Sequence, residues 1–204
     1  SNREQNKKFY DKLFDAADEY LGKILSHIEE LGLAKNTLIV IVSDHGISVG
    51  EKFGERAYGV FCYDYTLTAT ALFCHPNIAP TKVKNQVRSI DVLPTILEIL
   101  DIKADSKYEK FQGESVIPFL YGKGISKIAF SQSGNPLNTG KPPKEPNVWA
   151  VRTDDWKFIR NIHDGTEELY SLKDDPREEN NVISRFPQKA VELRAQLDLI
   201  ASDT

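Results

Sequence analysis

Thr37-Leu-Ile-Val-Ile-Val-Ser43, followed directly by Asp44-His45-Gly46, is the stretch of sequence that decides the fold. A run of β-branched residues that is apolar on both faces is typical of a central strand in a parallel sheet. The run stops at an acid and an imidazole, and in open α/β sheets ligands bind beyond the carboxyl ends of the strands. The stretch therefore predicts an α/β fold with a ligand crevice at Asp44 and His45.

The segments around this strand fit the same architecture. Residues 6–33 carry apolar side chains at three- and four-residue steps, which predicts an amphipathic helix. We expect a second buried strand over residues 69–74 and a helix over residues 87–100. The loop between the two strands, residues 47–64, is rich in glycine and charge and is long enough to carry a function.

The second part of the chain changes character. Four short segments of strand composition are separated by turn clusters, which predicts an antiparallel meander. These segments are residues 128–131, 148–153, 156–161 and 168–172, and a terminal helix is expected over 190–201. We therefore predict two parts. Residues 1–125 form an α/β domain with a partial parallel or mixed sheet flanked by helices, and residues 126–204 form a small α+β subdomain.

Composition excludes several classes of protein. The 204 residues include 26 Lys and Arg against 30 Asp and Glu, which gives a net charge of −4. Proteins that bind nucleic acid normally carry a basic surplus, so we expect no such partner. No apolar run approaches the roughly 20 residues that span a bilayer, so we expect no membrane span. The two cysteines, Cys62 and Cys74, lack CxxC spacing and are expected to be buried free thiols.

Two groups of residues could carry chemistry. Asp44 and His45 offer an oxygen and a nitrogen donor to a hard divalent cation. The alternative is a strand-end turn with an ordinary loop histidine, because two ligands cannot complete a shell of about six. Lys52 and Arg56 are candidates to bind sulfate or phosphate, or else belong to a solvated loop whose charges pair with one another. These residues alone lead to a candidate crevice for a metal and an oxyanion.

Several segments, taken in order, resemble the C-terminal half of a sulfatase, a family of the alkaline phosphatase superfamily. Residues 36–46 are similar to the metal-binding strand end of the family, and the loop from Gly50 resembles its Gly-Glu-His-Gly region. Further similar segments are residues 89–95, 151–160 and 168–176. The resemblance covers nearly the whole chain, and it is the combination of segments that is specific.

The resemblance implies a sulfuric ester hydrolase that acts on small anionic esters. In the family, a formylglycine made from Cys or Ser attacks the sulfur of the ester. A divalent cation, usually Ca²⁺ with Mg²⁺ or Mn²⁺ as alternatives, steadies the oxyanion. By resemblance, Asp44 and His45 are metal ligands, and Lys52 or Arg56 contacts the sulfate or the leaving oxygen.

The chain departs from the family pattern at the nucleophile. Neither Cys62 nor Cys74 is followed at short spacing by Pro or Ala and then Arg, and the N-terminal pair of Asp ligands is absent. The Gly-Glu-His-Gly motif reads Gly50-Glu51-Lys52-Phe53-Gly54, without the histidine. We therefore expect a missing N-terminal half of the same protein to supply the nucleophile, and this chain to be inactive alone.

Two other functions stay open at this stage. The first is a phosphoric ester hydrolase or phosphoglycerol transferase of the same superfamily, because the Asp-His-Gly strand end does not separate sulfate from phosphate. The second is a non-catalytic module that binds an anion or a protein partner.

Overall fold

The computed structural model describes residues 3–55, 57–103, 111–136, 141 and 143–202. The helices are α1 (Arg3–Glu30), α2 (Asp64–Leu67), α3 (Val92–Ile99), α4 (Ile117–Leu120) and α5 (Pro187–Ser202). The strands are β1 (Ile39–Val42), β2 (Ala71–Cys74), β3 (Ala129–Ser133), β4 (Val148–Arg152), β5 (Trp156–Asn161) and β6 (Thr166–Ser171). Across the described residues, no helix combines the length and the apolar character needed to cross a membrane.

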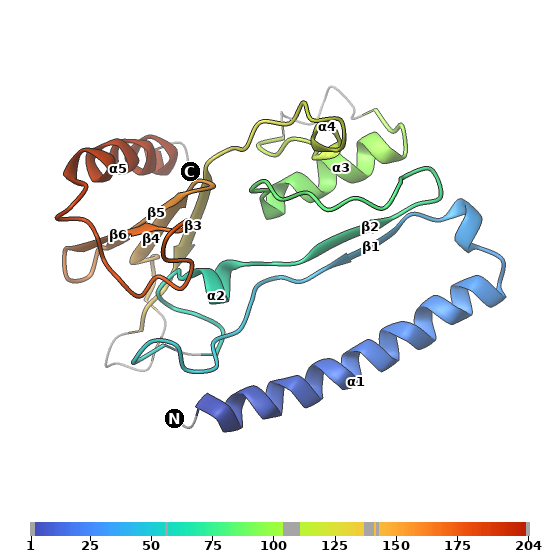
Figure 1. The fold of residues 1–204 in the computed structure, drawn as a ribbon, viewed down its shortest axis with the longest axis horizontal. Helices are drawn as coiled ribbons and strands as arrows, with labels where there is room; N and C mark the ends of the chain where they lie inside the picture. The colour runs from blue at the N-terminus through green and yellow to red at the C-terminus, as the bar shows by residue number, and fades with distance from the viewer. Residues whose placement is uncertain (1–2, 56, 104–110, 137–140, 142, 203–204) are drawn as a thin grey trace.

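β1 and β2 form a two-stranded sheet with helices on both sides. α1 runs along one side of this ribbon, and α3 and α4 lie on the other (Figure 1). The flanked sheet confirms the predicted α/β character. The pairing within it differs from the expected parallel strand, because β2 runs antiparallel to β1 and Ile39 pairs with Cys74. Apolar residues on both faces of a strand indicate that both faces are covered. They do not indicate whether the neighbouring strand runs parallel or antiparallel.

The apolar surface of this half is open to solvent. None of the residues of α1 described by the structure is buried, and the side chains of Phe9, Phe14 and Tyr20 are largely exposed. Val42 of β1 and Leu72 of β2 are also about half exposed, at 51% and 50%. A two-stranded sheet is marginal by itself in water, and a contiguous exposed apolar surface marks an interface. α1, β1 and β2 therefore offer a face that another segment of protein can cover.

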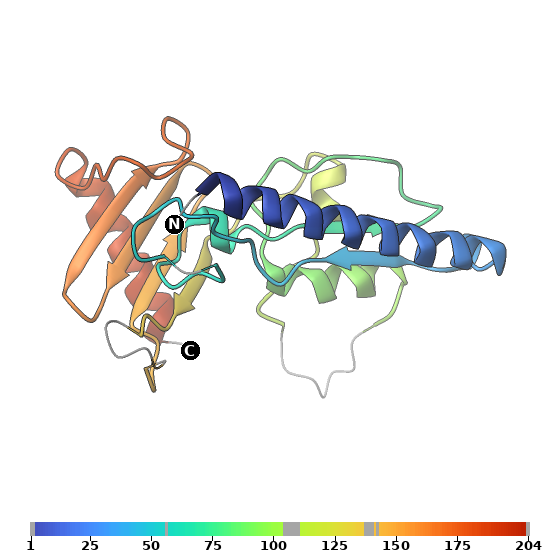
Figure 2. The ribbon, with the colours of Figure 1, turned by 90° about the horizontal axis from the view of Figure 1, so that it is seen from below.

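The main core lies in the C-terminal meander. β3, β4, β5 and β6 pair antiparallel in sequence order, as predicted. Successive side chains of a strand point to opposite faces, so each face carries its own cluster. One face packs against the loop before α2. The buried residues of this cluster, from the loop and the sheet together, are Cys62, Tyr63, Val148, Ala150, Ile159, Tyr170 and Leu172. The other face is covered by α5, as Figure 2 shows. The buried residues of this second cluster are Val151, Phe158, Leu169, Val182, Ala190, Leu193 and Leu197.

The two cysteines have different environments. Cys62 is 1% exposed inside the first of these clusters, which confirms the expected buried thiol. Cys74 is exposed at the end of β2, so the same expectation is wrong for this residue. The reason is that β2 belongs to the ribbon whose faces are largely open. The division of the chain at residues 125 and 126 stays a prediction.

Candidate active site

Asp44 and His45 lie just beyond β1 and face each other. Asp44 Oδ1 accepts a hydrogen bond of 2.9 Å from the backbone N–H of His45. His45 Nδ1 lies 2.6 Å from the carbonyl oxygen of Gly46, so this nitrogen carries a proton and donates it. In the neutral imidazole, Nε2 then holds the lone pair, and it lies 3.5 Å from Asp44 Oδ2.

This geometry fits a shared cation. Two neighbouring ligands about 2.1 to 2.4 Å from one ion are separated by about 3 to 3.5 Å. The side chains of Asp44 and His45 are 86% and 35% exposed, so both donor atoms can be reached. In the described part of the chain, no group of three or more His, Cys, Asp or Glu residues could hold a metal. The pair therefore offers two ligands, and a complete shell needs others from elsewhere.

A close backbone contact fixes the position of the pair. The N–H of Gly46 donates a hydrogen bond of 2.9 Å to the carbonyl oxygen of Thr66 in α2. A Cβ atom at Gly46 would lie only 2.4 Å from the carbonyl oxygen of Tyr65, so a side chain cannot be accommodated there. The glycine thus allows the end of β1 to lie directly against α2.

The loop after the pair is organised by Glu51. Its Oε2 accepts hydrogen bonds from Ser48 Oγ at 2.9 Å, from the N–H of Val49 at 2.8 Å and from the N–H of Gly50 at 3.1 Å. One carboxylate thereby holds three successive residues in a tight turn. Glu51 is a positioning residue that the sequence analysis did not single out.

Lys52 contacts the C-terminal part of the chain. Its Nζ donates a hydrogen bond to the backbone oxygen of Glu178 and lies 4.7 and 5.4 Å from the ring centroids of Tyr63 and Tyr170. The structure therefore brings Asp44 and His45 together and places the Lys52 ammonium against the C-terminal sheet. Arg56 lies outside the described residues. The roles of Lys52 and Arg56 stay predictions.

A buried charge cluster anchors α2 to the sheet. Lys157 Nζ, which is fully buried, lies 2.8 Å from Asp64 Oδ1 and 3.0 Å from Glu178 Oε1. Arg152 also donates to both carboxylate oxygens of Asp64. Burial raises the pKa of Asp64, but attraction by Lys157 and the hydrogen bonds from Arg152 outweigh it, so the pKa lies below its ordinary value. Burial is also the largest influence on Glu178 and raises its pKa.

The sequence analysis missed this cluster. Strand alternation in β5 places Lys157 on the same face as Ile159, which is a core position. A lysine at such a position requires a buried partner, and this was the signal that could have revealed it.

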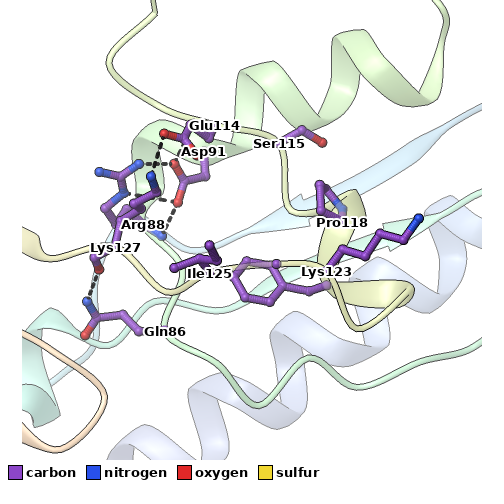
Figure 3. Close-up of a pocket in the computed structure, with 11 residues that line it drawn as sticks. Gln86, Arg88, Asp91, Glu114, Ser115, Pro118, Lys123, Ile125 and Lys127 are labelled. Atoms are coloured by element: carbon purple, nitrogen blue, oxygen red, sulfur yellow. Dashed lines mark hydrogen bonds and ion pairs between the residues drawn. The ribbon is translucent and has the colours of Figure 1, made fainter.

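Two hollows are present in the described part of the chain. One, of about 290 Å³, lies between the loop after β1 and the turn that joins β5 to β6, and it includes Lys52 and Phe53. The other, of about 160 Å³, lies between residues 86–91, which precede α3, and residues 114–127, which include α4 (Figure 3). In this second hollow Asp91 accepts hydrogen bonds from Arg88 Nη2 and from the N–H of Glu114. These contacts are internal to the fold and give Asp91 a structural role.

Comparison with known proteins decides the family. The family model described as Sulfatase matches residues 1–102, and the model described as N-sulphoglucosamine sulphohydrolase, C-terminal, matches residues 57–202. The chain belongs to the sulfatase family. This confirms the resemblance found in the sequence, and with it the assignment to a family of hydrolases.

The curated relatives are longer than this sulfatase-family chain. It is 29% identical over 193 residues to an N-acetylglucosamine-6-O-sulfatase of Bacteroides thetaiotaomicron, covering 90% of the chain and 33% of that protein. It is 27% identical over 205 residues to arylsulfatase K of Homo sapiens, covering 94% of the chain and 36% of that protein. The chain thus spans about a third of the length of the curated relatives it matches.

Solved structures agree with the α/β fold. A protein in complex with its substrate D-glucosamine-2-N,6-O-disulfate superposes with a TM-score of 0.69 at 27% identity, over 92% of this chain and 38% of that one. A phosphonate monoester hydrolase of Agrobacterium radiobacter superposes with a TM-score of 0.66 at 24% identity, over 88% and 39%. The second match shows a shared fold alone.

Proposed function

We propose that this chain is the C-terminal part of a sulfatase that hydrolyses sulfuric esters of small anionic substrates. The observation that carries the proposal is the 3.5 Å approach of Asp44 Oδ2 and His45 Nε2 at the end of β1. Sulfatase is also the description of the family model that matches this segment. Positive charge that is fixed in place before the reaction stabilises the negative charge that develops on the ester oxygens.

Asp44 and His45 supply two ligands to a divalent cation in this proposal. Ca²⁺ is the leading candidate because a carboxylate is a hard donor, with Mg²⁺ and Mn²⁺ as alternatives. When bound, such a cation acts as a Lewis acid on the sulfuryl oxygens. The chain's own contribution is orientation, because the Gly46 carbonyl fixes the imidazole and the His45 N–H fixes the carboxylate.

Lys52 and Arg56 are proposed to contact the sulfate or the leaving oxygen. An ammonium has three donor hydrogens, and one hydrogen of Lys52 bonds to the Glu178 carbonyl. The ammonium also lies over the rings of Tyr63 and Tyr170, and Lys52 lines the 290 Å³ hollow. The support for both residues is their place in the charged loop that follows Asp44 and His45.

An N-terminal part of the same protein is proposed to complete the enzyme. It would carry the formylglycine and the remaining metal ligands, and it would cover the apolar face of α1, β1 and β2. The exposure of Phe9, Phe14, Val42 and Leu72 supports this, together with the short span of the chain relative to its relatives. The chain by itself is then inactive, because half a metal shell without a nucleophile cannot perform the reaction.

Hydrolysis by the complete protein that contains this chain tests the proposal. We expect turnover of nitrophenyl sulfate and of a glucosamine sulfate, loss of turnover with EDTA and recovery with Ca²⁺. Asp44→Ala should lower kcat at least about 100-fold, whereas Asp18→Ala on the exposed surface of α1 serves as the matched control. Faster turnover of the corresponding phosphate esters, or unchanged turnover in Asp44→Ala, would contradict the proposal.

A further inference from the structure

One short segment, residues 66–70, holds the chain on both sides of the candidate ligand pair at the end of β1. Before the pair, the N–H of Ser43 donates a hydrogen bond of 3.0 Å to the carbonyl oxygen of Thr70, and the N–H of Thr70 donates one of 2.8 Å to Ser43 Oγ. After the pair, the N–H of Gly46 donates to the carbonyl oxygen of Thr66 at 2.9 Å. The backbone of the pair is therefore fixed at both ends by the same segment.

This segment depends on other parts of the chain for its own position. α2, with which it begins, is a single helical turn of four residues, and so short a helix is not stable in water without tertiary contacts. The ribbon of β1 and β2, on the other side of the pair, is itself marginal and largely open to solvent. The position of the two candidate ligands therefore depends on what fixes α2.

Asp64, the first residue of α2, ties this turn to the C-terminal sheet. Its carboxylate accepts hydrogen bonds of 2.9 to 3.1 Å from Arg152 and one of 2.8 Å from Lys157. Its backbone N–H donates to Glu178 Oε2 at 2.6 Å. The guanidinium of Arg152 is held in turn by Gln86, whose Oε1 accepts from Nη1 at 2.6 Å. The Asp64 side chain is only 17% exposed, so water weakens these contacts little.

We propose that Asp64 is a positioning residue for Asp44 and His45, through which the C-terminal sheet sets the affinity of the pair for a cation. The inference rests on the proposed function, in which the pair supplies two ligands to a divalent cation. A metal site requires its ligands to be held within about 0.5 Å of their productive positions. Groups that orient metal ligands without touching the metal change its affinity by about 10- to 100-fold when they are removed.

The alternative role for Asp64 is stability alone, and a matched pair of variants separates the two roles. Asp64→Asn keeps the size of the side chain but removes the charge that attracts Arg152 and Lys157. Leu193→Ala is the control, because it leaves a cavity under α5, on the opposite face of the sheet from α2, and lowers stability there. If Asp64 only stabilised the fold, the two variants would bind a cation equally well.

Calorimetric titration of the complete protein with Ca²⁺ tests the inference. We expect the dissociation constant for Ca²⁺ to rise about tenfold or more in Asp64→Asn and to stay at the wild-type value in Leu193→Ala. Arg152→Lys keeps the charge but loses the fork of donors, so it should raise the dissociation constant by a smaller factor. This milder variant keeps the test decisive if Asp64→Asn does not fold.

Hydrogen exchange of the metal-free complete protein, followed by mass spectrometry, gives a second measurement that needs no cation. Peptides that contain residues 43–46 should exchange about tenfold faster in Asp64→Asn than in the wild type, because the segment that holds them is released. In Leu193→Ala their exchange should stay at the wild-type rate. The increase should therefore follow the contacts of α2 and not the loss of stability.

The inference and the proposed function fail in different ways. A wild-type affinity for Ca²⁺ in Asp64→Asn, or an equal loss of affinity in Leu193→Ala, would overturn the inference and leave the proposed function intact. Binding of Ca²⁺ by Asp44→Ala as tightly as by the wild type would overturn the proposed function. The exchange of residues 43–46 then decides the positioning role by itself, and equal exchange in Asp64→Asn and the wild type would overturn it.

Discussion

The ammonium of Lys157 lies 2.8 Å from the carboxylate of Asp64, and the lysine side chain is completely buried. Glu178, which is also buried, lies on the other side of the ammonium at 3.0 Å. The backbone N–H of Asp64 in turn donates a hydrogen bond of 2.6 Å to Glu178 Oε2. This cluster fastens the start of α2 to β5. Because Gly46 lies against α2, the cluster also helps to hold the end of β1 in place.

The first prediction concerns the stability of this cluster. Lys157→Met removes the positive charge and leaves the carboxylates of Asp64 and Glu178 with less compensation in the interior. We expect the free energy of unfolding to fall by about 3 to 5 kcal/mol, measured by urea unfolding at neutral pH. Lys189→Met is the matched control, because Lys189 pairs with Glu192 on the surface and such pairs contribute less than about 1 kcal/mol. Equal stability of the two variants would contradict the structure.

The second prediction is a dependence of stability on pH. Burial raises the pKa of Asp91, but hydrogen bonds from Arg88 and from the N–H of Glu114 outweigh it and hold the pKa below its ordinary value of 3.8. A depressed pKa in the folded state adds stability above the ordinary value, and this stability is lost as the pH falls through the folded value. Asp91→Asn should therefore cost about 2 kcal/mol at neutral pH.

The difference between Asp91→Asn and the wild type should shrink below about pH 4 as the wild-type carboxyl becomes protonated. Urea unfolding from about pH 7 down to about pH 3 measures it, with Asp18→Asn on the exposed surface of α1 as the control. A difference that stays constant over the whole range would show that ionisation of Asp91 is not the source of the stability.

The sequence predicts those elements whose pattern is local. Segments of strand composition between turn clusters predict the meander, and the three-to-four-residue repeat predicts α1. The direction of β2 relative to β1 is not local, because it depends on the path of the chain between residues 43 and 70. Exposure of Cys74 is not local either, since it depends on what covers the ribbon.

For the candidate site too, the sequence analysis predicted only the features that are local in the sequence. Asp44 and His45 were recognisable because they are adjacent in the sequence and follow a strand. The 290 Å³ hollow was not recognisable in the sequence. It joins Phe53 to Asn161 and His163, which are more than 100 residues away along the chain. Lys52 shows the same limit, since the sequence places it in the loop but does not show that its ammonium reaches the backbone of Glu178.

The third prediction separates the two thiols. Burial raises the pKa of Cys62 to about 12, and the side chain lies in the core, so it is inert in the folded chain. Cys74 is exposed. A thiol reagent such as dithionitrobenzoate should therefore react with one cysteine in the folded chain and with both in urea. Cys74→Ser should abolish the reaction of the folded chain, and rapid labelling of Cys62 in that variant would show that the core around it is not closed.

The fourth prediction concerns Lys52 in the complete protein and distinguishes catalysis from structure. If the ammonium contacts the sulfate, Lys52→Met should lower kcat about 100-fold or more for a sulfate ester, and Lys52→Arg should retain part of the activity because it keeps the charge. The lost contacts are one hydrogen bond to Glu178 and the approach of the ammonium to the rings of Tyr63 and Tyr170, so the free energy of unfolding should fall by about 1 to 2 kcal/mol. A variant that loses several kcal/mol of stability but keeps kcat would show that Lys52 only joins the loop to the C-terminal sheet. Arg56 would then be the remaining candidate to contact the sulfate.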